Sequence, residues 1–412
     1  MRSVNVRTIA PFGISVPASK LTSMSEATAH NDDRLPALDG LRGFAALFVM
    51  FYHLTMQVEP HTVPAIAFKN LFSFGWTGVD LFFVLSGFLI TGLLVSAKGS
   101  TNYFRVFYAR RTLRILPLYY LALIVLFGVP MIIRLPHDFV VPFRDQLWFW
   151  FYLQNFHWLG SQFAGLTGPL WSLAIEEQFY LVWPLVVLLT SRRQALWVCA
   201  GCLAVSLIYR TYAVTTIPHL DTYYVTQARL DGLAIGSGIA LLTREGDWLE
   251  RLRKYVPATT IAALITLAAI GANIRGDHRP LYPLLYLAIA VFYGGILVVA
   301  LSSGASGPWS FLKSRLLRFY GRYSYALYVV HVPVMTVLWH VGITPPNLSL
   351  GGSDLIGAVL YIVVIVPVAT LLAWLSWHLF EKHFLKLKRN FVYERAAKNA
   401  KAPLLAAPLT VE

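Results

Sequence analysis

The segment Leu38 to His53 reads LDGLRGFAALFVMFYH, and with its flanks it forms a mainly hydrophobic run over residues 36–57. A helix of about 20 apolar residues is long enough to span the hydrocarbon core of a bilayer. Nine further runs of similar length follow it. The sequence therefore predicts an all-α protein, a polytopic transmembrane bundle of about ten helices with no fused soluble domain. The predicted spans are 36–57, 72–96, 115–133, 171–190, 195–213, 225–243, 256–274, 281–301, 319–341 and 355–380.

Composition supports a membrane protein over a soluble one. Hydrophobic residues make up 57% of the 412 residues and charged residues only 13%, whereas soluble domains carry about 25% charge. The net charge of +14 can indicate nucleic-acid binding, but the long apolar runs favour the membrane, and no nucleic-acid partner is expected. Cys199 and Cys202 share one helix face inside an apolar run, so we interpret them as packing residues and expect no metal site.

Charge also predicts the orientation and the domain limits. With the N-terminus in the cytoplasm, 26 of the 34 lysines and arginines fall on inside segments or at inner span ends, 6 on outside segments or at outer span ends, and the other 2 further within spans, as the positive-inside rule requires. Both termini are therefore expected in the cytoplasm. We predict a disordered tail over 1–33, a membrane domain over 34–385 and a basic tail over 386–412 that is unpacked from about Phe391. The aromatic run over 147–152 is too short to span and is typical of the interface.

Two polar residues of the first span lie on one helix face. Arg42 and His53 are three turns apart, which places them about 16 Å apart along the axis. Arg42 lies near the cytoplasmic end, where an arginine can also serve as a topology anchor. His53 lies deep in the span. A neutral imidazole is tolerated there as a structural group, and it can also accept a proton.

The second and third spans add further charges. Asp80 lies in an otherwise apolar run, where it could orient His53 or pair with an arginine. Arg111 and Arg114 are neighbours at i and i+3 and lie beside Arg110, in the segment that leads into the third span. Such a cluster can bind phosphate groups, or it can act only as a topology determinant.

The fourth span begins with two adjacent carboxylates, Glu176 and Glu177, close to Ser172 and Gln178. Acidic groups compensate the dipole at a helix N-terminus. Two of them beside two further polar groups exceed what compensation needs. Because this helix is expected to begin on the outer side, these groups could contact an acceptor hydroxyl there.

Later spans contain two more polar sets. Arg229 and Asp231 lie on different faces of the sixth span, so they need not pair with each other. Ser324, Tyr328 and His331 follow the spacing i, i+4, i+7 in the ninth span and share one face. A polar face in a membrane helix is expected to point into the bundle interior and not at lipid.

Taken together and in this order, these motifs resemble the acyltransferase-3 family of integral-membrane carbohydrate O-acyltransferases. The matching segments extend from about Leu35 to Glu381 and cover nearly the whole membrane part. They are the pair Arg42-x10-His53, the pair Arg111-x-x-Arg114, the segment Trp171 to Tyr180, the segment Gly75 to Gly87, the segment Arg229 to Gly232 and the segment Gly321 to His331.

The resemblance implies an enzyme of the bacterial inner (plasma) membrane. It would transfer an acyl group, typically acetyl, from acyl-coenzyme A to a sugar hydroxyl of a cell-surface or exported polysaccharide or glycoconjugate. Acetyl-coenzyme A would be a co-substrate, with no permanently bound cofactor. Two alternatives stay open: a membrane transporter or flippase, which would also use buried charges along a path, and an acyltransferase acting on a lipid or a small secondary metabolite.

On this interpretation each polar residue receives an expected role. The roles are: His53 as general base or transient acyl carrier; Asp80, or else Glu176 or Glu177, as the group that orients it; Arg42, Arg111 and Arg114 as the donor-phosphate site; Glu176, Glu177 and Arg229 on the acceptor side; and Ser324 and His331 facing the same cavity.

Overall fold

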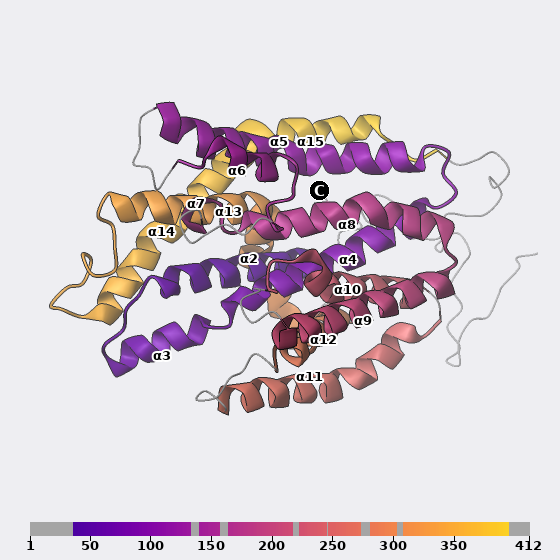
Figure 1. The fold of residues 1–412 in the computed structure, drawn as a ribbon, viewed down its shortest axis with the longest axis horizontal. Helices are drawn as coiled ribbons and strands as arrows, with labels where there is room; N and C mark the ends of the chain where they lie inside the picture. Colours follow the sequence, from indigo (N-terminus) through magenta and orange to yellow (C-terminus); the bar gives the residue numbers. More distant parts are fainter. Residues whose placement is uncertain are drawn as a thin grey trace, which may run out of the picture. The chain divides into compact units, whose positions relative to one another are not determined.

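The computed structural model describes residues 36–132, 140–156, 164–216, 222–244, 246–272, 281–302 and 308–394. These ranges are almost entirely helical and contain no β-strand (Figure 1). The predicted N-terminal tail, and the C-terminal tail from residue 395, lie outside the described residues. The main helices are α2 (Pro36–Met56), α3 (Val63–Phe72), α4 (Gly78–Ala97), α5 (Tyr103–Ile132), α6 (Phe143–Trp150), α7 (Ala164–Thr167), α8 (Leu170–Leu189), α9 (Arg192–Thr216), α10 (Leu230–Leu242), α11 (Trp248–Ala272), α12 (Tyr282–Ser302), α13 (Arg315–His340), α14 (Asp354–Ser376) and α15 (Lys382–Lys386).

Every predicted span coincides with one of these helices, which confirms the helical bundle. Among the described residues, seven helical segments are long and apolar enough to cross a membrane by length and composition. The other three predicted spans correspond to α10, α11 and α13, and α10 is short, with 13 residues. Figure 1 shows the axes of α5, α8, α9 and α11 lying roughly parallel, with α8 running in the opposite sense to the other three.

The structure corrects the start of the third span. The sequence predicts a span over 115–133, but α5 begins at Tyr103, so the arginine cluster lies inside the helix. The first turns of α5 are buried in the bundle through Tyr103, Val106 and Phe107. Their packing stabilises helix on the N-terminal side of the predicted span. The aromatic segment predicted at the interface overlaps the short helix α6, whose Phe149 carbonyl accepts a hydrogen bond from α5.

Small residues allow two helix pairs to pack backbone to backbone. On α13, a Cβ added at Gly321 would overlap the carbonyl of Asp39 on α2. On α10, a Cβ added at Gly236 would overlap the carbonyl of Val84 on α4. In lipid, helix association depends on such close van der Waals contact because the apolar solvent gives little hydrophobic driving force between helices. The pairs α2–α13 and α4–α10 make the most extensive helix contacts in the described part of the chain.

A buried polar contact ties three of the helices together. Thr91 of α4 donates to Ser237 of α10 at 2.8 Å and accepts from the indole N–H of Trp183 on α8 at 2.7 Å. Every polar group in this contact has a partner, which a low-dielectric interior requires. The contact fixes α8 relative to the α4–α10 pair.

The described residues after α15, 387–394, are packed, in contrast to the expectation of an unpacked tail from about Phe391. After a 3₁₀ turn, Leu387–Asn390, the segment 391–394 lies against the start of α5. Asn102 donates to the Val392 carbonyl at 2.9 Å and accepts from the Glu394 amide at 3.0 Å, and Arg110 donates to the Phe391 carbonyl at 2.8 Å. The prediction is wrong for 391–394 because these partners lie almost 300 residues away in sequence.

Candidate active site

Two histidines from different helices meet inside the bundle. Nε2 of His331 on α13 lies 3.2 Å from Nδ1 of His53 on α2. Each ring lies about 25 Å along its helix from the first described helical residue, at 1.5 Å per residue. His331 is 1% exposed, whereas His53 is only half-buried. The sequence predicted both residues in the site, but not their contact.

The predicted polar face of α13 points into the bundle. Ser324, Tyr328 and His331 are all buried. The hydroxyl of Tyr328 shares a hydrogen bond of 2.7 Å with Ser172 on α8, and its ring lies 5.8 Å from that of His331. Tyr328 also interacts electrostatically with Glu176. This face therefore connects the histidine pair to the carboxylates of α8.

The three predicted donor arginines converge from two helices. Arg42 of α2 interacts electrostatically with Arg111 of α5 and with Glu176 of α8. Arg114 interacts with both Arg42 and Arg111. Three like charges in one place repel each other unless acidic side chains or a bound anion compensate them. Within the described residues, Nη1 of Arg114 is buried without a hydrogen-bond partner, so the cluster retains donor capacity for an anion.

Glu176 and Glu177 lie beside these arginines and not apart from them. The sequence placed the carboxylates on the outer side and the arginines at the inner face. In the structure Glu177, like Glu176, interacts electrostatically with Arg111. The difference arises because α5 begins twelve residues before the predicted span, so Arg111 lies about 12 Å into the helix. The acidic and basic groups form one cluster inside the bundle.

Tyr180 organises this cluster, a role that the sequence did not assign. The guanidinium of Arg111 lies 4.9 Å from the centre of the Tyr180 ring. The Tyr180 hydroxyl donates to Glu176 at 3.1 Å and therefore accepts from Ser86 at 2.5 Å. Tyr180 occurs in the quoted segment that begins at Trp171, so its position in the motif was visible, although its contacts were not.

Asp80 does not contact the histidine pair. It pairs with Arg229, whose Nη2 lies 2.9 Å from Oδ1 of Asp80, and both side chains are essentially unexposed. This outcome agrees with the second of the two roles that the sequence left open for Asp80. The sequence also indicated that Arg229 and Asp231 need not pair with each other. In the structure Asp231 pairs with Arg210 at 2.7 Å instead.

Arg229 is enclosed by its neighbours. Its guanidinium carbon lies within 4.9–5.8 Å of the ring centres of four aromatic side chains: Phe83, Trp171, Tyr223 and Tyr286. With 0% exposure it joins α10 to α4. A contact between Arg229 and an acceptor stays a prediction. Its observed partners give it the role of holding the helices next to the site.

Two buried charges escaped the sequence analysis. The positive-inside count grouped Arg210, at the outer end of the predicted span 195–213, with the outside segments, but it lies within α9, is 0% exposed and donates to both Asp231 and the Ala228 carbonyl. Glu381 lies in a π-helical turn, Trp377–Glu381, accepts from Ser376 at 2.9 Å and interacts electrostatically with Arg114. π-helical turns occur often at functional sites. Both residues stand at span ends, where hydropathy alone does not separate loop from helix.

Comparison with known proteins places this arrangement in a family. The model of the acyltransferase-3 family, described as an acyltransferase domain, matches residues 35–378. Similar curated proteins include the peptidoglycan O-acetyltransferase OatA of Listeria monocytogenes, which is 31% identical over 79% of this chain and 53% of its own length. YrhL of Bacillus subtilis is 30% identical over 84% and 54%, and the O-acetyltransferase OatA of Staphylococcus aureus is 29% identical over 73% and 50%.

The chain thus spans about half the length of these relatives. No solved structure matches it significantly. The family match includes the ten residues proposed for the site. With most of its length matched by one family model and its helices apolar enough to cross a membrane several times, this multi-pass membrane protein belongs to the acyltransferase-3 family.

Proposed function

We propose that this protein transfers an acetyl group from acetyl-coenzyme A in the cytoplasm to a hydroxyl of a cell-wall or other surface polysaccharide. The observation that carries the proposal is the convergence of three arginines, two glutamates and a histidine pair inside one membrane bundle. Two of the similar proteins are O-acetyltransferases by name, which supports the reaction class. The one from Listeria monocytogenes is named for peptidoglycan, which supports peptidoglycan as the acceptor.

The arginine cluster fits the donor. Coenzyme A presents several phosphate oxygens, and guanidinium groups bind phosphates through paired, charge-assisted hydrogen bonds. Arg42 and Arg111 are half-buried, so their guanidinium groups are partly accessible while their stems are held by the bundle. With both termini in the cytoplasm, the donor would enter from the end at which α2 and α5 begin. Glu176 and Tyr180 would then hold Arg111 in place.

His53 fits the general base. In the reaction the acceptor hydroxyl oxygen attacks the thioester carbonyl carbon, and a C–O bond forms as His53 takes the hydroxyl proton. The tetrahedral oxyanion collapses, the C–S bond breaks, and the leaving thiolate receives the proton from the His53 imidazolium. His53 is half-buried, so its ring can meet both substrates.

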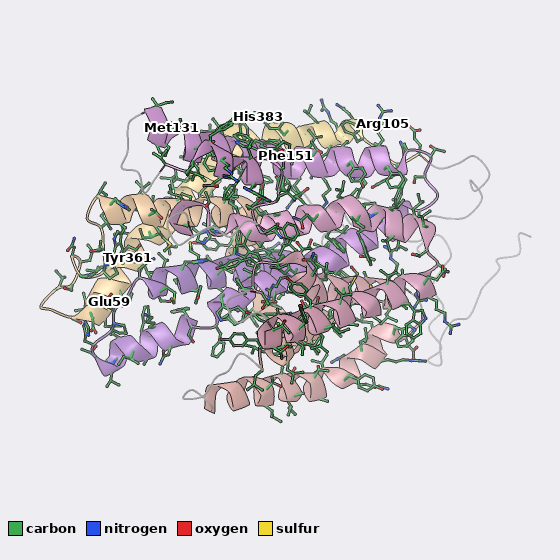
Figure 2. The ribbon with its side chains drawn as sticks, in the orientation of Figure 1. Glu59, Arg105, Met131, Phe151, Tyr361 and His383 are labelled. Carbon is green, nitrogen blue, oxygen red and sulfur yellow. The ribbon has the colours of Figure 1, made fainter. Side chains whose placement is uncertain are left out.

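The test uses purified protein in liposomes, labelled acetyl-coenzyme A and a peptidoglycan fragment as acceptor. We expect coenzyme A release and labelled acceptor with the unaltered protein, and loss of both in His53→Ala. His383→Ala is the matched control, because His383 is exposed on α15 (labelled in Figure 2) and should retain full activity. Full activity of a well-folded His53→Ala variant would exclude the base role. Transport of either compound without donor consumption would instead favour a transporter.

A further inference from the structure

The hydrogen bonds of His331 define which of its ring nitrogens carries the proton. Nδ1 of His331 lies 3.0 Å from the carbonyl oxygen of Leu327, one turn earlier on α13. A carbonyl oxygen can only accept a hydrogen bond, so Nδ1 carries the hydrogen. In the neutral ring Nε2 then has a lone pair and acts as an acceptor.

The position of the hydrogen on His331 also determines which ring nitrogen of His53 carries a hydrogen. Nε2 of His331 faces Nδ1 of His53 at 3.2 Å, and two lone pairs at that distance would repel. Nδ1 of His53 must therefore carry the hydrogen and donate it. The Val49 carbonyl, one turn earlier on α2, also accepts from the His53 ring, so the single N–H of that ring is shared between Val49 and His331. Because a neutral imidazole has one N–H, the lone pair of His53 lies on Nε2, the nitrogen that faces away from His331.

We propose that His331 is a positioning residue for His53, an inference that rests on the proposed acetyl transfer. His331 fixes the tautomer and the ring orientation of His53, so that Nε2 is the nitrogen that takes the acceptor proton. It also stabilises the imidazolium formed by that transfer, because its lone pair already accepts from Nδ1–H. A buried acidic residue supplies this function in many hydrolases. Asp80 is committed to Arg229, and Glu176 and Glu177 lie with Arg111. His331 is therefore the side chain whose hydrogen bond reaches His53.

The same contacts argue against substrate binding by His331. Both of its ring nitrogens are engaged, one by Leu327 and one by His53. Its side chain is 1% exposed, so it offers almost no accessible surface to a sugar or thioester. The expected role of His331 on the substrate side is therefore replaced by an indirect role through His53.

Two substitutions separate positioning from packing. In His331→Gln the side-chain oxygen can occupy the place of Nε2 and accept from His53, whereas His331→Leu fills similar volume without an acceptor. Loss of one buried hydrogen-bond partner predicts a kcat about 10- to 100-fold lower for His331→Leu, with the KM for acetyl-coenzyme A nearly unchanged. His331→Gln should recover most of that loss. Equal losses in both variants, or an unchanged kcat in His331→Leu, would overturn the proposal.

A spectroscopic measurement tests the tautomer without any turnover. Nitrogen-15 NMR of histidine-labelled protein distinguishes a protonated from an unprotonated ring nitrogen, and His53→Ala assigns the His53 signals. We expect Nδ1–H and bare Nε2 for His53, and a mixture of tautomers in His331→Leu. A His53 with its hydrogen on Nε2 in the unaltered protein would contradict the inference. If the protein shows the expected tautomer but consumes no donor, the proposed acetyl transfer fails and the positioning contact stands.

Discussion

Arg229 on the turn before α10 donates to Asp80 on α4 at 2.9 Å, and neither side chain is more than 1% exposed. A second buried pair, Arg210 with Asp231, joins α9 to α10. Charges inside a membrane bundle are costly unless they are paired. The two pairs therefore hold α4, α9 and α10 in register next to the candidate active site.

Replacing one partner of the Arg229–Asp80 pair should destabilise the fold more than replacing both partners. We expect Arg229→Leu alone to lower the free energy of unfolding by about 3–5 kcal/mol, because it leaves the Asp80 carboxylate buried without its partner. The double variant Arg229→Leu/Asp80→Leu should recover part of this loss, since no buried charge remains. Unfolding in detergent, followed by circular dichroism, measures both.

The matched control is the exposed pair of Arg251 and Asp247, whose side chains are 56% and 63% exposed. Arg251→Leu should leave the unfolding transition unchanged, because solvent screens exposed pairs. A double variant less stable than Arg229→Leu would show that the pair contributes more than its desolvation costs. That result would contradict the expectation.

Two glycines of α10 provide a sharp test of the close helix contact. Gly236 faces the Val84 carbonyl with no room for a Cβ, whereas Gly238 has nothing within 4 Å of the position a Cβ would take. Gly236→Ala should destabilise the protein by about 1–3 kcal/mol through overpacking. Gly238→Ala should be neutral or stabilising by up to about 1 kcal/mol, because alanine favours helix. Similar melting temperatures for the two variants would refute the contact.

Hydropathy was sufficient to locate the helices, because crossing a bilayer is a local requirement on about 20 consecutive residues. Helical periodicity likewise placed Ser324, Tyr328 and His331 on one buried face. Both inferences depend only on residues within one segment. They needed no knowledge of which helix lies next to which.

Partner choice could not be predicted in this way. Asp80 had two candidate roles in the sequence, and only the packing of α4 on α10 decides for Arg229 over His53. Arg210 looked like a loop residue, since a charge at the end of an apolar run marks a boundary in most helices. Its burial depends on Asp231, which is 21 positions later. Such contacts follow from tertiary packing, which one chain's composition does not encode locally.

Arg111 should contribute to donor binding if the arginine cluster holds the phosphates of coenzyme A. Arg111→Ala removes a charge-assisted contact, so we expect the KM for acetyl-coenzyme A to rise about 10- to 100-fold. Arg105→Ala is the matched control on the same helix, because Arg105 is exposed (labelled in Figure 2) and should leave KM unchanged. Steady-state kinetics over a range of salt concentrations measures both. Equal effects of the two substitutions would mean that net charge, and not the cluster, matters.

The segment 391–394 should leave α5 at high pH through ionisation of Tyr393. Burial raises the pKa of Tyr393 to about 12, although Arg110 and Arg111 act to lower it. A free tyrosine has a pKa of about 10. The docked state therefore holds the phenol neutral more strongly than the released state does. Its stabilisation is complete below about pH 10 and is lost as the pH rises through about 12.

A spin label on Val392→Cys reports this release as increased mobility, in a background with Cys199→Ala and Cys202→Ala. We expect the label to become mobile between about pH 10 and 12 in the parent protein, and to stay immobile over that window in Tyr393→Phe, which cannot ionise. Asn102→Ala should mobilise the label already at neutral pH, because Asn102 makes two of the bonds that hold the segment. A label in Tyr393→Phe that is released over the same pH range would assign the change to another group, and the burial of the Tyr393 phenol would then not control the docking.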